Sequence, residues 1–542
     1  MPTVEEDSAF EHELCHKNEL VIGEMKEFSI SKDDEDTKLL LVRNEDGDYC
    51  AFGNKCTHYG APLIQGVMKN GRIRCSRHGA CFSSKTGDIE DYPGLDSLPK
   101  HNVYINKHDK VVVHTTKKAL KSEKRIKAMK TAMKNDVKVV IIGGGASALT
   151  CSESLRQQGF CGQIIVVNKS NLLPYDRPIM TKDLSAKIDD ILMRSKDFYN
   201  NFGIVLKLGT EVVNINAHEK IIECKNKDEI SYDKLLISTG LTVRKLDIPG
   251  SNLKNVFVIG TPSDCNIAAE RARGKRVLVI GASFTGMEVV CFLRQVCKEI
   301  TVCCRKSVPF EQAFGKEVGA GLQKLHENRG VKFHTKNGVV KIVGKDVVEG
   351  VILENGLLVE VDVVVAGVGA TLNTGFLKSS SLQIDREGFI VVNKYLQTNL
   401  PDVYAAGAAV RFPLRYYGGK LVNVEHWQMA HYHGKIAGLN MSASVQDPET
   451  NFQNFHSVDS IPFFYTEQYG MEIQYAGYGE DHDEVMIHGD IANGKFSAFY
   501  FKENKLVAVA AMQNANIAAI VAEKLLAGEN IEKWNLSQLP FE

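Results

Sequence analysis

The sequence predicts a chain of several domains: a small antiparallel β domain, two α/β domains with parallel sheets, and a C-terminal α+β domain. Its 542 residues exceed what one hydrophobic core normally organises. Residues 20–115 consist of short apolar runs separated by turn residues, which is typical of antiparallel strands. A strand, a glycine-rich turn, a helix and a second strand follow one another from residue 138 and again from residue 276. This repeated pattern is typical of dinucleotide-binding folds.

The composition is that of an ordinary globular protein, with 44% hydrophobic and 24% charged residues. A net charge of −1 gives no indication of a nucleic-acid partner. Residues 1–14 are acidic and carry no secretory or transit pattern, and no run approaches the roughly 18 apolar residues that span a bilayer. The thirteen cysteines are scattered, and the adjacent Cys303 and Cys304 lie in a strand-like run. We therefore expect buried thiols, no membrane segment and a cytoplasmic location.

Two Cys-His pairs in the β domain, Cys56-x-His58 and Cys75-x-x-His78, point to a metal centre. Each pair is followed by a tight glycine-bearing loop, which suits a Rieske [2Fe–2S] cluster with two Cys on one iron and two His on the other. Such a cluster takes up single electrons at roughly −150 to +300 mV. The alternatives are a Cys2His2 zinc site, whose fingers usually carry both Cys before both His, and a chance grouping of core Cys with surface His.

Residues 116–136 are rich in Lys and lack the apolar periodicity of a core helix. We expect a solvated tether or exposed helix that lets the cluster domain dock and undock. The alternative is a surface that binds acidic partners or membranes.

The first glycine-rich turn, Gly143-x-Gly145-x-x-Ala148, fits the G-x-G-x-x-G/A pattern of Rossmann folds. Gly143 permits the turn, Gly145 lets the backbone approach a pyrophosphate, and Ala148 allows close helix packing. The second turn reads Gly281-x-Ser283-x-x-Gly286 and lies about 140 residues further on. Two such turns predict two dinucleotides, a flavin and a nicotinamide. Because Ser283 replaces a glycine, an empty structural unit is the alternative for the second.

Three further segments carry a resemblance to a known family. Residues 173–178 (LPYDRP) with Lys182, then Ser238-Thr239-Gly240, and then residues 398–407 (TNLPDVYAAG) resemble flavoprotein ferredoxin reductases and apoptosis-inducing factors. The resemblance covers about residues 20–530. Residues 75–82 (CSRHGACF) resemble the second loop of ferredoxin-type Rieske domains, although Ser76 departs from the family's usual Pro.

The resemblance implies a glutathione-reductase-like arrangement behind an N-terminal Rieske domain. The implied limits are 1–115 for the Rieske domain, 116–136 for a basic linker, 137–260 and 386–450 for the FAD domain, 261–385 for the NAD(P) domain, and 451–542 for the C-terminal reductase domain.

The resemblance also implies the site residues. Residues that would contact FAD or NAD(P)H are Gly143, Gly145, Ala146, Ala148, Arg177, Lys182, Val212, Thr239, Gly240, Gly281, Ser283, Gly286, Arg305, Gly369, Gly407 and Trp427. Trp427, Glu425 and Glu288 would lie at the reacting centre, and Cys56, His58, Cys75 and His78 would hold the cluster.

Four positions depart from the family pattern or decide between cofactors. Ala408 stands where the family usually has an Asp that binds the flavin's ribityl chain, and Asn168 ends a strand where an acid usually grips a ribose. We expect FAD to bind more weakly as a result. Arg305 favours NADPH over NADH, because guanidinium suits a 2′-phosphate; a solvated loop is the alternative. Tyr465 replaces a Trp of related reductases.

Together these features predict an FAD-dependent NAD(P)H oxidoreductase that passes electrons through flavin to its own Rieske cluster, and on to an unidentified small-molecule or protein acceptor. The alternative is a redox-sensing or apoptosis-related signalling flavoprotein with slow turnover. An oxygenase has less support, because no two-His, one-carboxylate set is evident. A homodimer and a mitochondrial location are further expectations from the family.

Overall fold

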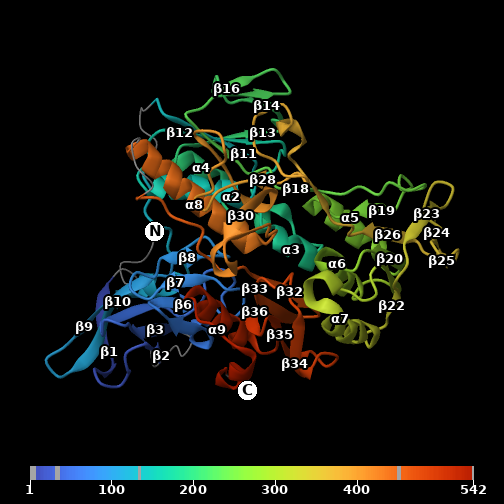
Figure 1. Cartoon of the computed structure of the whole chain (residues 1–542). Coiled ribbons are helices and arrows are strands. Elements are labelled where there is room, and N and C mark those ends of the chain that lie inside the picture. Colours follow the sequence, from blue (N-terminus) through green and yellow to red (C-terminus); the bar gives the residue numbers. More distant parts are fainter. Residues whose placement is uncertain (1–7, 31–36, 132–135, 448–452, 540–542) are drawn as a thin grey trace.

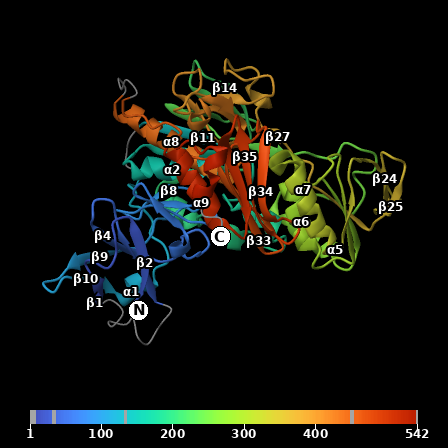
Figure 2. The same ribbon diagram turned by 60° about the horizontal axis from the view of Figure 1, so that its bottom comes forward.

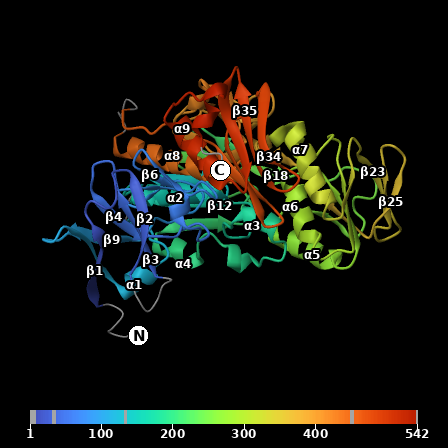
Figure 3. The same cartoon turned by 90° about the horizontal axis from the view of Figure 1, so that it is seen from below.

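The computed structural model describes residues 8–30, 37–131, 136–447 and 453–539. Figure 1 shows the N-terminal β domain beside the C-terminal sheet, with the first α/β domain above them and the second at the right. The N-terminal domain and the second α/β domain lie at opposite ends of the molecule (Figure 3). No helix in the described ranges is long and apolar enough to cross a membrane.

The N-terminal domain contains two antiparallel sheets. Exposed and partly buried residues alternate along the edge strand Ala9–His16, whereas the strands Lys38–Arg43 and Lys110–Thr116 are mostly buried. The larger sheet has the order β1 (Ala9–His16), β10 (Lys110–Thr116), β9 (Lys100–Ile105), β4 (Tyr49–Gly53), β3 (Lys38–Arg43) and β2 (Glu24–Ser29). The smaller sheet has the order β5 (Val67–Lys69), β6 (Arg72–Arg74), β7 (Cys81–Ser83) and β8 (Ile89–Asp91). The two Cys-His loops connect β4 to β5 and β6 to β7.

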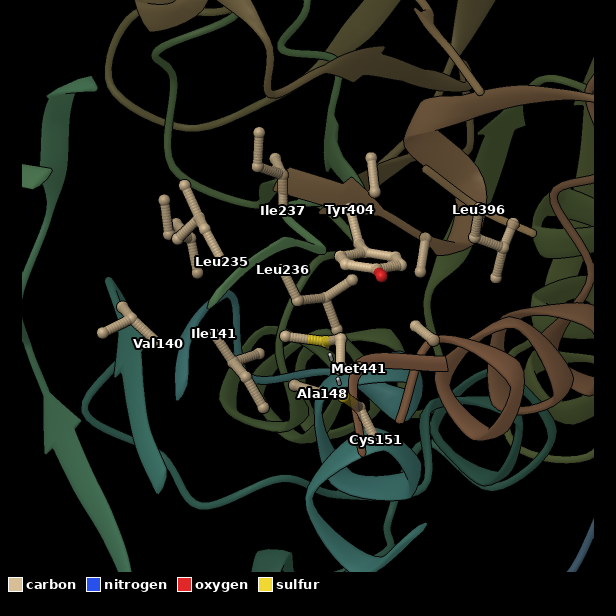
Figure 4. Packing of buried hydrophobic residues seen from close by; sticks show 14 of the residues in the cluster. Val140, Ile141, Ala148, Cys151, Leu235, Leu236, Ile237, Leu396, Tyr404 and Met441 are labelled. Atoms are coloured by element: carbon tan, nitrogen blue, oxygen red, sulfur yellow. Dashed lines mark hydrogen bonds between the residues drawn. The ribbon is translucent and has the colours of Figure 1, made fainter. Parts of the chain in front are cut away.

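The first α/β domain is built on a parallel sheet whose central strands are almost wholly buried. Its order is β13 (Ile204–Leu208), β12 (Gln163–Asn168), β11 (Lys138–Ile142), β17 (Lys234–Ile237) and β29 (Val403–Ala405). Figure 4 shows side chains of β11, β17 and β29 packing toward Cys151 and Met441 of the covering helices α2 (Ala146–Gln157) and α8 (Trp427–Gln446). These helices approach closely because Gly434 and Gly438 of α8 leave no room for a Cβ atom against α2.

The second α/β domain repeats this plan. Its parallel sheet has the order β19 (Val256–Val258), β26 (Val363–Ala366), β20 (Arg276–Ile280), β21 (Glu299–Cys303) and β22 (Val331–His334), with helices α5 (Pro262–Ala272), α6 (Phe284–Leu293) and α7 (Glu311–Glu327). The expected boundary at residues 260/261 is therefore too late, since β19 is already hydrogen-bonded to β26. The paired strands β18 (Leu241–Val243) and β27 (Ala370–Leu372) lie where the chain passes into and out of this domain.

Short sheets complete the two α/β domains. The first domain has an antiparallel sheet of β14 (Val212–Asn216), β15 (Ile221–Cys224) and β16 (Glu229–Ser231). It also has a mixed sheet in which β30 (Val410–Leu414) pairs parallel with β28 (Ile390–Val391) and antiparallel with β31 (Lys420–Val422). The second has β23 (Val339–Val343), β24 (Gly350–Leu353) and β25 (Leu358–Glu360). The short helices α3 (Arg177–Lys182) and α4 (Lys196–Asn201) connect β12 to β13.

The C-terminal domain is a five-stranded antiparallel sheet with one long helix, α9 (Ala515–Leu526). The strand order is β32 (Phe463–Gln468), β33 (Met471–Gly477), β36 (Lys505–Met512), β35 (Lys495–Lys502) and β34 (Glu484–Asp490). In Figure 2 this domain lies between the N-terminal domain and the second α/β domain. Its strands contact the second cluster loop and also line a cavity of the second α/β domain.

The Lys-rich segment, expected as a solvated tether or exposed helix, begins with a short exposed helix and stays largely exposed, but it lies along the N-terminal domain. After the short helix α1 (Lys117–Lys121), the chain runs extended along the N-terminal domain. The backbones of Arg125 and Ser97 form a β-bridge, and the Arg125 guanidinium pairs with Asp88 at 2.6 Å. Residues 132–135 of the expected linker lie outside the described residues. Arg125 and Lys127 thus pair with the β domain, while most other side chains of the segment are exposed.

Candidate functional site

The two Cys-His pairs converge at the tips of neighbouring loops. The Nδ1 atoms of His58 and His78 lie 3.1 Å apart, and the thiols of Cys56 and Cys75 form a hydrogen bond. Backbone N–H groups of His58 and Tyr59 donate to the Cys56 sulfur, and those of the equivalent residues in the second loop donate to Cys75. No three His, Cys, Asp or Glu side chains in the described ranges converge as one mononuclear site would need. The residues are thus arranged as one sulfur pair and one imidazole pair, which fits a [2Fe–2S] cluster.

The second cluster loop is pressed against the C-terminal sheet. A Cβ atom on Gly79 would lie 2.5 Å from the ring of Phe463, so this close approach requires glycine, which also has a φ of +82°. His78 Nε2 lies 3.2 Å from Glu472 Oε1, and Arg77 donates to both oxygens of Glu472 at 2.7 and 2.6 Å. Burial acts to raise the pKa of Glu472, but the hydrogen bonds from His78 and Arg77 lower it to about 2. Glu472 is therefore ionised, and these hydrogen bonds fix its position.

A cavity of about 1260 Å³ extends over the carboxyl ends of β11, β12 and β17. This is the edge at which ligands bind in parallel α/β sheets. Predicted residues that line it are Gly143, Gly145, Ala146, Arg177, Lys182, Val212, Thr239, Gly240, Gly407, Glu288, Glu425 and Trp427. Ala148, by contrast, is buried in α2 and has a packing position.

The walls of this cavity fit a bound dinucleotide such as FAD. A Cβ on Gly143 would lie 2.2 Å from the Ser238 carbonyl oxygen, whereas one on Gly145 meets nothing within 4 Å. Gly145 is the N-cap of α2, so the first-turn N–H groups of the helix are available to an anion. Thr239 Oγ1 has no hydrogen-bond partner among the described residues and lines the same cavity.

One end of this cavity is formed by the cluster loop itself. His78 of the N-terminal domain lines the cavity together with Tyr465 of β32. Their ring centroids lie 3.9 Å apart, and the Tyr465 ring also lies under the Lys182 ammonium at 4.7 Å. Lys182 is paired with Glu288 at 3.0 Å, and Thr466 donates to the same carboxylate at 2.8 Å. A cluster ligand, an aromatic ring and a buried ion pair thus meet at one end of the cavity.

A second cavity, of about 1070 Å³, lies at the N-terminus of α6 and meets the first. Gly281, Ser283, Arg305 and Gly369, the residues that the resemblance assigns to NAD(P)H, line it. Gly286 instead packs against the turn, where a Cβ would lie 2.1 Å from the Gly281 carbonyl oxygen.

Residues common to both cavities mark the place where two bound molecules could react. Glu425, His426, Phe284 and Phe464 line both. Burial lowers the pKa of His426 to about 4, and burial with the Glu480 charge raises the pKa of Glu425. At neutral pH His426 is therefore uncharged, so it brings no positive charge to the place where the two cavities meet.

The residues that decide the cofactor questions have the following positions. Arg305 is 76% exposed at the mouth of the second cavity, and its NH2 group pairs with Glu354 at 3.0 Å. Ala408 lines the first cavity and brings no polar side chain to it. Asn168 also lines it, where its side-chain nitrogen would lie 2.3 Å from a Cβ on Gly144. Cys303 and Cys304 are both buried, which confirms that prediction.

Buried ion clusters join the N-terminal domain to the rest of the chain. Arg74 is completely buried and donates to Glu523 of α9 at 2.5 Å, while its NH2 lies 3.4 Å from Asp91. A second cluster joins Asp96 to Arg194 and Glu153 of the first α/β domain. Each of these charges is shielded from water and paired across a domain boundary, so loss of one partner would leave an unpaired ion buried. The structure therefore shows the N-terminal domain docked on its neighbours, and its undocking stays a prediction.

The residues that bind the cluster loops to the other domains were not predicted. Glu472 and Glu523 belong to no motif, and Asp176, which accepts a hydrogen bond from Tyr59 at 2.7 Å, lies within LPYDRP but was not assigned a role. Their partners lie between 117 and 449 residues away in the chain.

Comparisons with known proteins agree with this geometry. Residues 11–102 match the Rieske [2Fe-2S] domain, 137–434 the pyridine nucleotide-disulphide oxidoreductase family, and 463–538 the reductase C-terminal domain. The chain is 40% identical to apoptosis-inducing factor 3 of Homo sapiens over 527 residues, covering 96% of this chain and 84% of that protein. It belongs to the apoptosis-inducing factor 3 family.

More distant relatives of this family are reductases. Rhodocoxin reductase of Rhodococcus erythropolis is 29% identical over 396 residues, covering 72% of this chain and 90% of that protein. The crystal structure of the ferredoxin reductase for the CYP199A2 system from Rhodopseudomonas palustris has a TM-score of 0.67 and 26% identity, covering 73% of this chain and 96% of that one. This member of the apoptosis-inducing factor 3 family is thus an NAD(P)H-dependent flavoprotein oxidoreductase with FAD and a Rieske [2Fe–2S] cluster as cofactors. The match to the Rieske [2Fe-2S] domain favours an iron–sulfur cluster over zinc in this part of the chain.

Proposed function

We propose that this chain passes electrons from NAD(P)H through FAD to its own Rieske [2Fe–2S] cluster, and from there to a separate acceptor. The observation that carries the proposal is the position of His78, which belongs to the cluster loop and also lines the first cavity. The nicotinamide and flavin would supply two-electron transfer, and the cluster would accept the electrons singly.

The residues of the first cavity are proposed to hold FAD. The backbone of Gly143, Gly145 and Ala146 at the N-terminus of α2 would bind the pyrophosphate, with Ala148 setting the helix against the sheet. Arg177 and Lys182 bring positive charge, and Val212, Thr239, Gly240, Gly407 and Trp427 form the remaining contacts. Glu288 fixes the Lys182 ammonium, and Glu425 borders the place where both cavities meet.

The second cavity is proposed to hold the nicotinamide dinucleotide, with Gly281, Ser283 and Gly286 forming its phosphate-binding turn. We propose NADPH as the preferred donor, because the exposed guanidinium of Arg305 can contact a 2′-phosphate. Glu354 already pairs with Arg305 and would compete with that phosphate, so the preference is expected to be modest.

The arrangement of side chains supports transfer within one molecule. The buried ion clusters hold His78 at the end of the first cavity, and the Tyr465 ring fills the space beside it. A fixed separation replaces a diffusional encounter, so transfer between the two centres would not depend on protein concentration.

The test is anaerobic mixing of the complete, cofactor-containing protein with one equivalent of NADPH. Flavin absorbance and the EPR signal of the reduced cluster are followed together. The proposal predicts that the cluster signal appears at a rate independent of protein concentration. A Cys75→Ser variant should keep flavin reduction and lose the cluster signal. Reduced flavin with a persistently oxidised cluster would refute the proposal, and a slow, stable reduced complex would favour the signalling alternative.

A further inference from the structure

The two imidazoles of the cluster loops have different surroundings. Both Nδ1 atoms face each other at 3.1 Å, so these are the nitrogens that can bind one iron. The His58 ring stacks on Tyr59, with centroids 3.6 Å apart. The Nε2 atom of His78 lies 3.2 Å from Glu472 Oε1, a residue of another domain. Of these two imidazole ligands, only His78 contacts a carboxylate within the part of the chain that the structure describes.

Glu472 is held firmly in this position. It lies on β33, its side chain is 10% exposed, and Arg77 binds both of its oxygens. Gln474, two residues along the strand, donates to Oε2 at 3.1 Å. With these donors on its other lone pairs, the carboxylate keeps one oxygen directed at the imidazole, and its charge is shielded from solvent.

We propose that Glu472 is a positioning residue that fixes the orientation of His78 and lowers the reduction potential of the cluster. A carboxylate that accepts a hydrogen bond from a metal-bound imidazole sets the ring orientation and makes the ligand more electron-donating. A buried negative charge beside the site also opposes the arrival of an electron. Both effects favour the oxidised cluster.

Arg77 acts in the opposite direction, since its guanidinium offsets the charge of Glu472. Because Glu472 belongs to the C-terminal domain, the potential of the cluster depends on contact between domains. The effect of Glu472 on the cluster potential does not depend on the route by which electrons reach the cluster.

The experiment is a redox titration of the complete protein, followed by EPR and visible absorbance, for the wild type and for Glu472→Gln. At a fixed ambient potential, the reduced-to-oxidised ratio of the variant should rise about tenfold, the lower end of the effect of outer-shell partners. For a one-electron couple this corresponds to an upward shift of roughly 59 mV. Arg77→Gln should shift the ratio in the opposite direction.

Glu467→Gln is the matched control. Glu467 lies directly opposite Glu472 on β32, so the variant removes the same charge from the same sheet without touching His78. Its ratio should change by less than about twofold, because the Glu467 charge makes only a small electrostatic contribution at Arg77. An unchanged or lowered potential in Glu472→Gln would overturn the inference, as would shifts of the same sign in Glu472→Gln and Arg77→Gln. If Glu472→Gln does not retain a cluster, the potential of Arg77→Gln decides. A potential of Arg77→Gln at or above the wild-type value would contradict the proposal.

Discussion

Glu523→Gln should loosen the contact between the cluster domain and the C-terminal domain. Arg74 is completely buried, with Glu523 at 2.5 Å and Asp91 at 3.4 Å. Asp91 in turn accepts hydrogen bonds from Gln428 and Ser460, so its charge is divided among several donors. Removing the Glu523 charge therefore leaves the Arg74 guanidinium only partly compensated in a place that water does not reach.

The expected cost follows from this burial. Breaking a buried ion pair by removing one partner costs about 3–5 kcal/mol. Because Asp91 still faces Arg74, we expect about 3 kcal/mol, which raises the population of the separated state roughly 100-fold. Replacing both Arg74 and Glu523 by Met should recover only part of the loss, because it leaves the buried Asp91 carboxylate without its guanidinium partner.

Hydrogen–deuterium exchange of the complete protein measures this directly. In β6–β8 and α9, the amides that exchange through separation of the two domains should exchange roughly 100-fold faster in Glu523→Gln. Asp346→Asn, which breaks the exposed pair with Lys254, is the control. It should change the free energy of domain separation by no more than about 1 kcal/mol. Wild-type exchange rates in Glu523→Gln would show that this ion cluster does not hold the domains together.

Three other outcomes are expected. Ala408→Asp should tighten FAD retention by about 10- to 150-fold, since a charged hydrogen bond contributes roughly 1.5–3 kcal/mol; equal flavin content after dialysis would contradict this. Arg305→Ser should lower kcat/KM for NADPH about tenfold more than for NADH, and Glu354→Gln should raise the NADPH value; steady-state kinetics that favour NADH in the wild type would refute both. Burial lowers the pKa values of His431 and His433 to about 3, below the unfolded value of about 6.5. Their neutral forms therefore stabilise the fold above pH 6.5, and this stability is lost toward pH 3 by about 1.4 kcal/mol per pH unit for each. His431→Phe should flatten the dependence of Tm on pH, and an identical dependence would count against this account.

Local patterns were enough to predict the parts of this protein that short segments encode. The cluster ligands lie within two loops, and their spacing alone indicates a sulfur pair and an imidazole pair. The turns at Gly143 and Gly281 predict two dinucleotide sites because the turn, the strand and the helix are neighbours in sequence. Boundaries were less predictable. Residues 256–258 were expected in the first α/β domain, yet β19 pairs with β26, and strand pairing is not encoded within three residues.

The sequence by itself determined the class of cofactors, the order of the domains and a minority of the residues around each cavity, chiefly those of the glycine-rich turns. Only the tertiary structure decided that His78 reaches the first cavity, that Glu472 contacts His78 across 394 residues of chain, and that Arg74 is paired with Glu523. The physical reason is that hydrophobic periodicity and turn chemistry report whether a segment is buried and how it bends. They carry no information on which distant surface covers it, and here the covering surfaces supply the charges around the cluster.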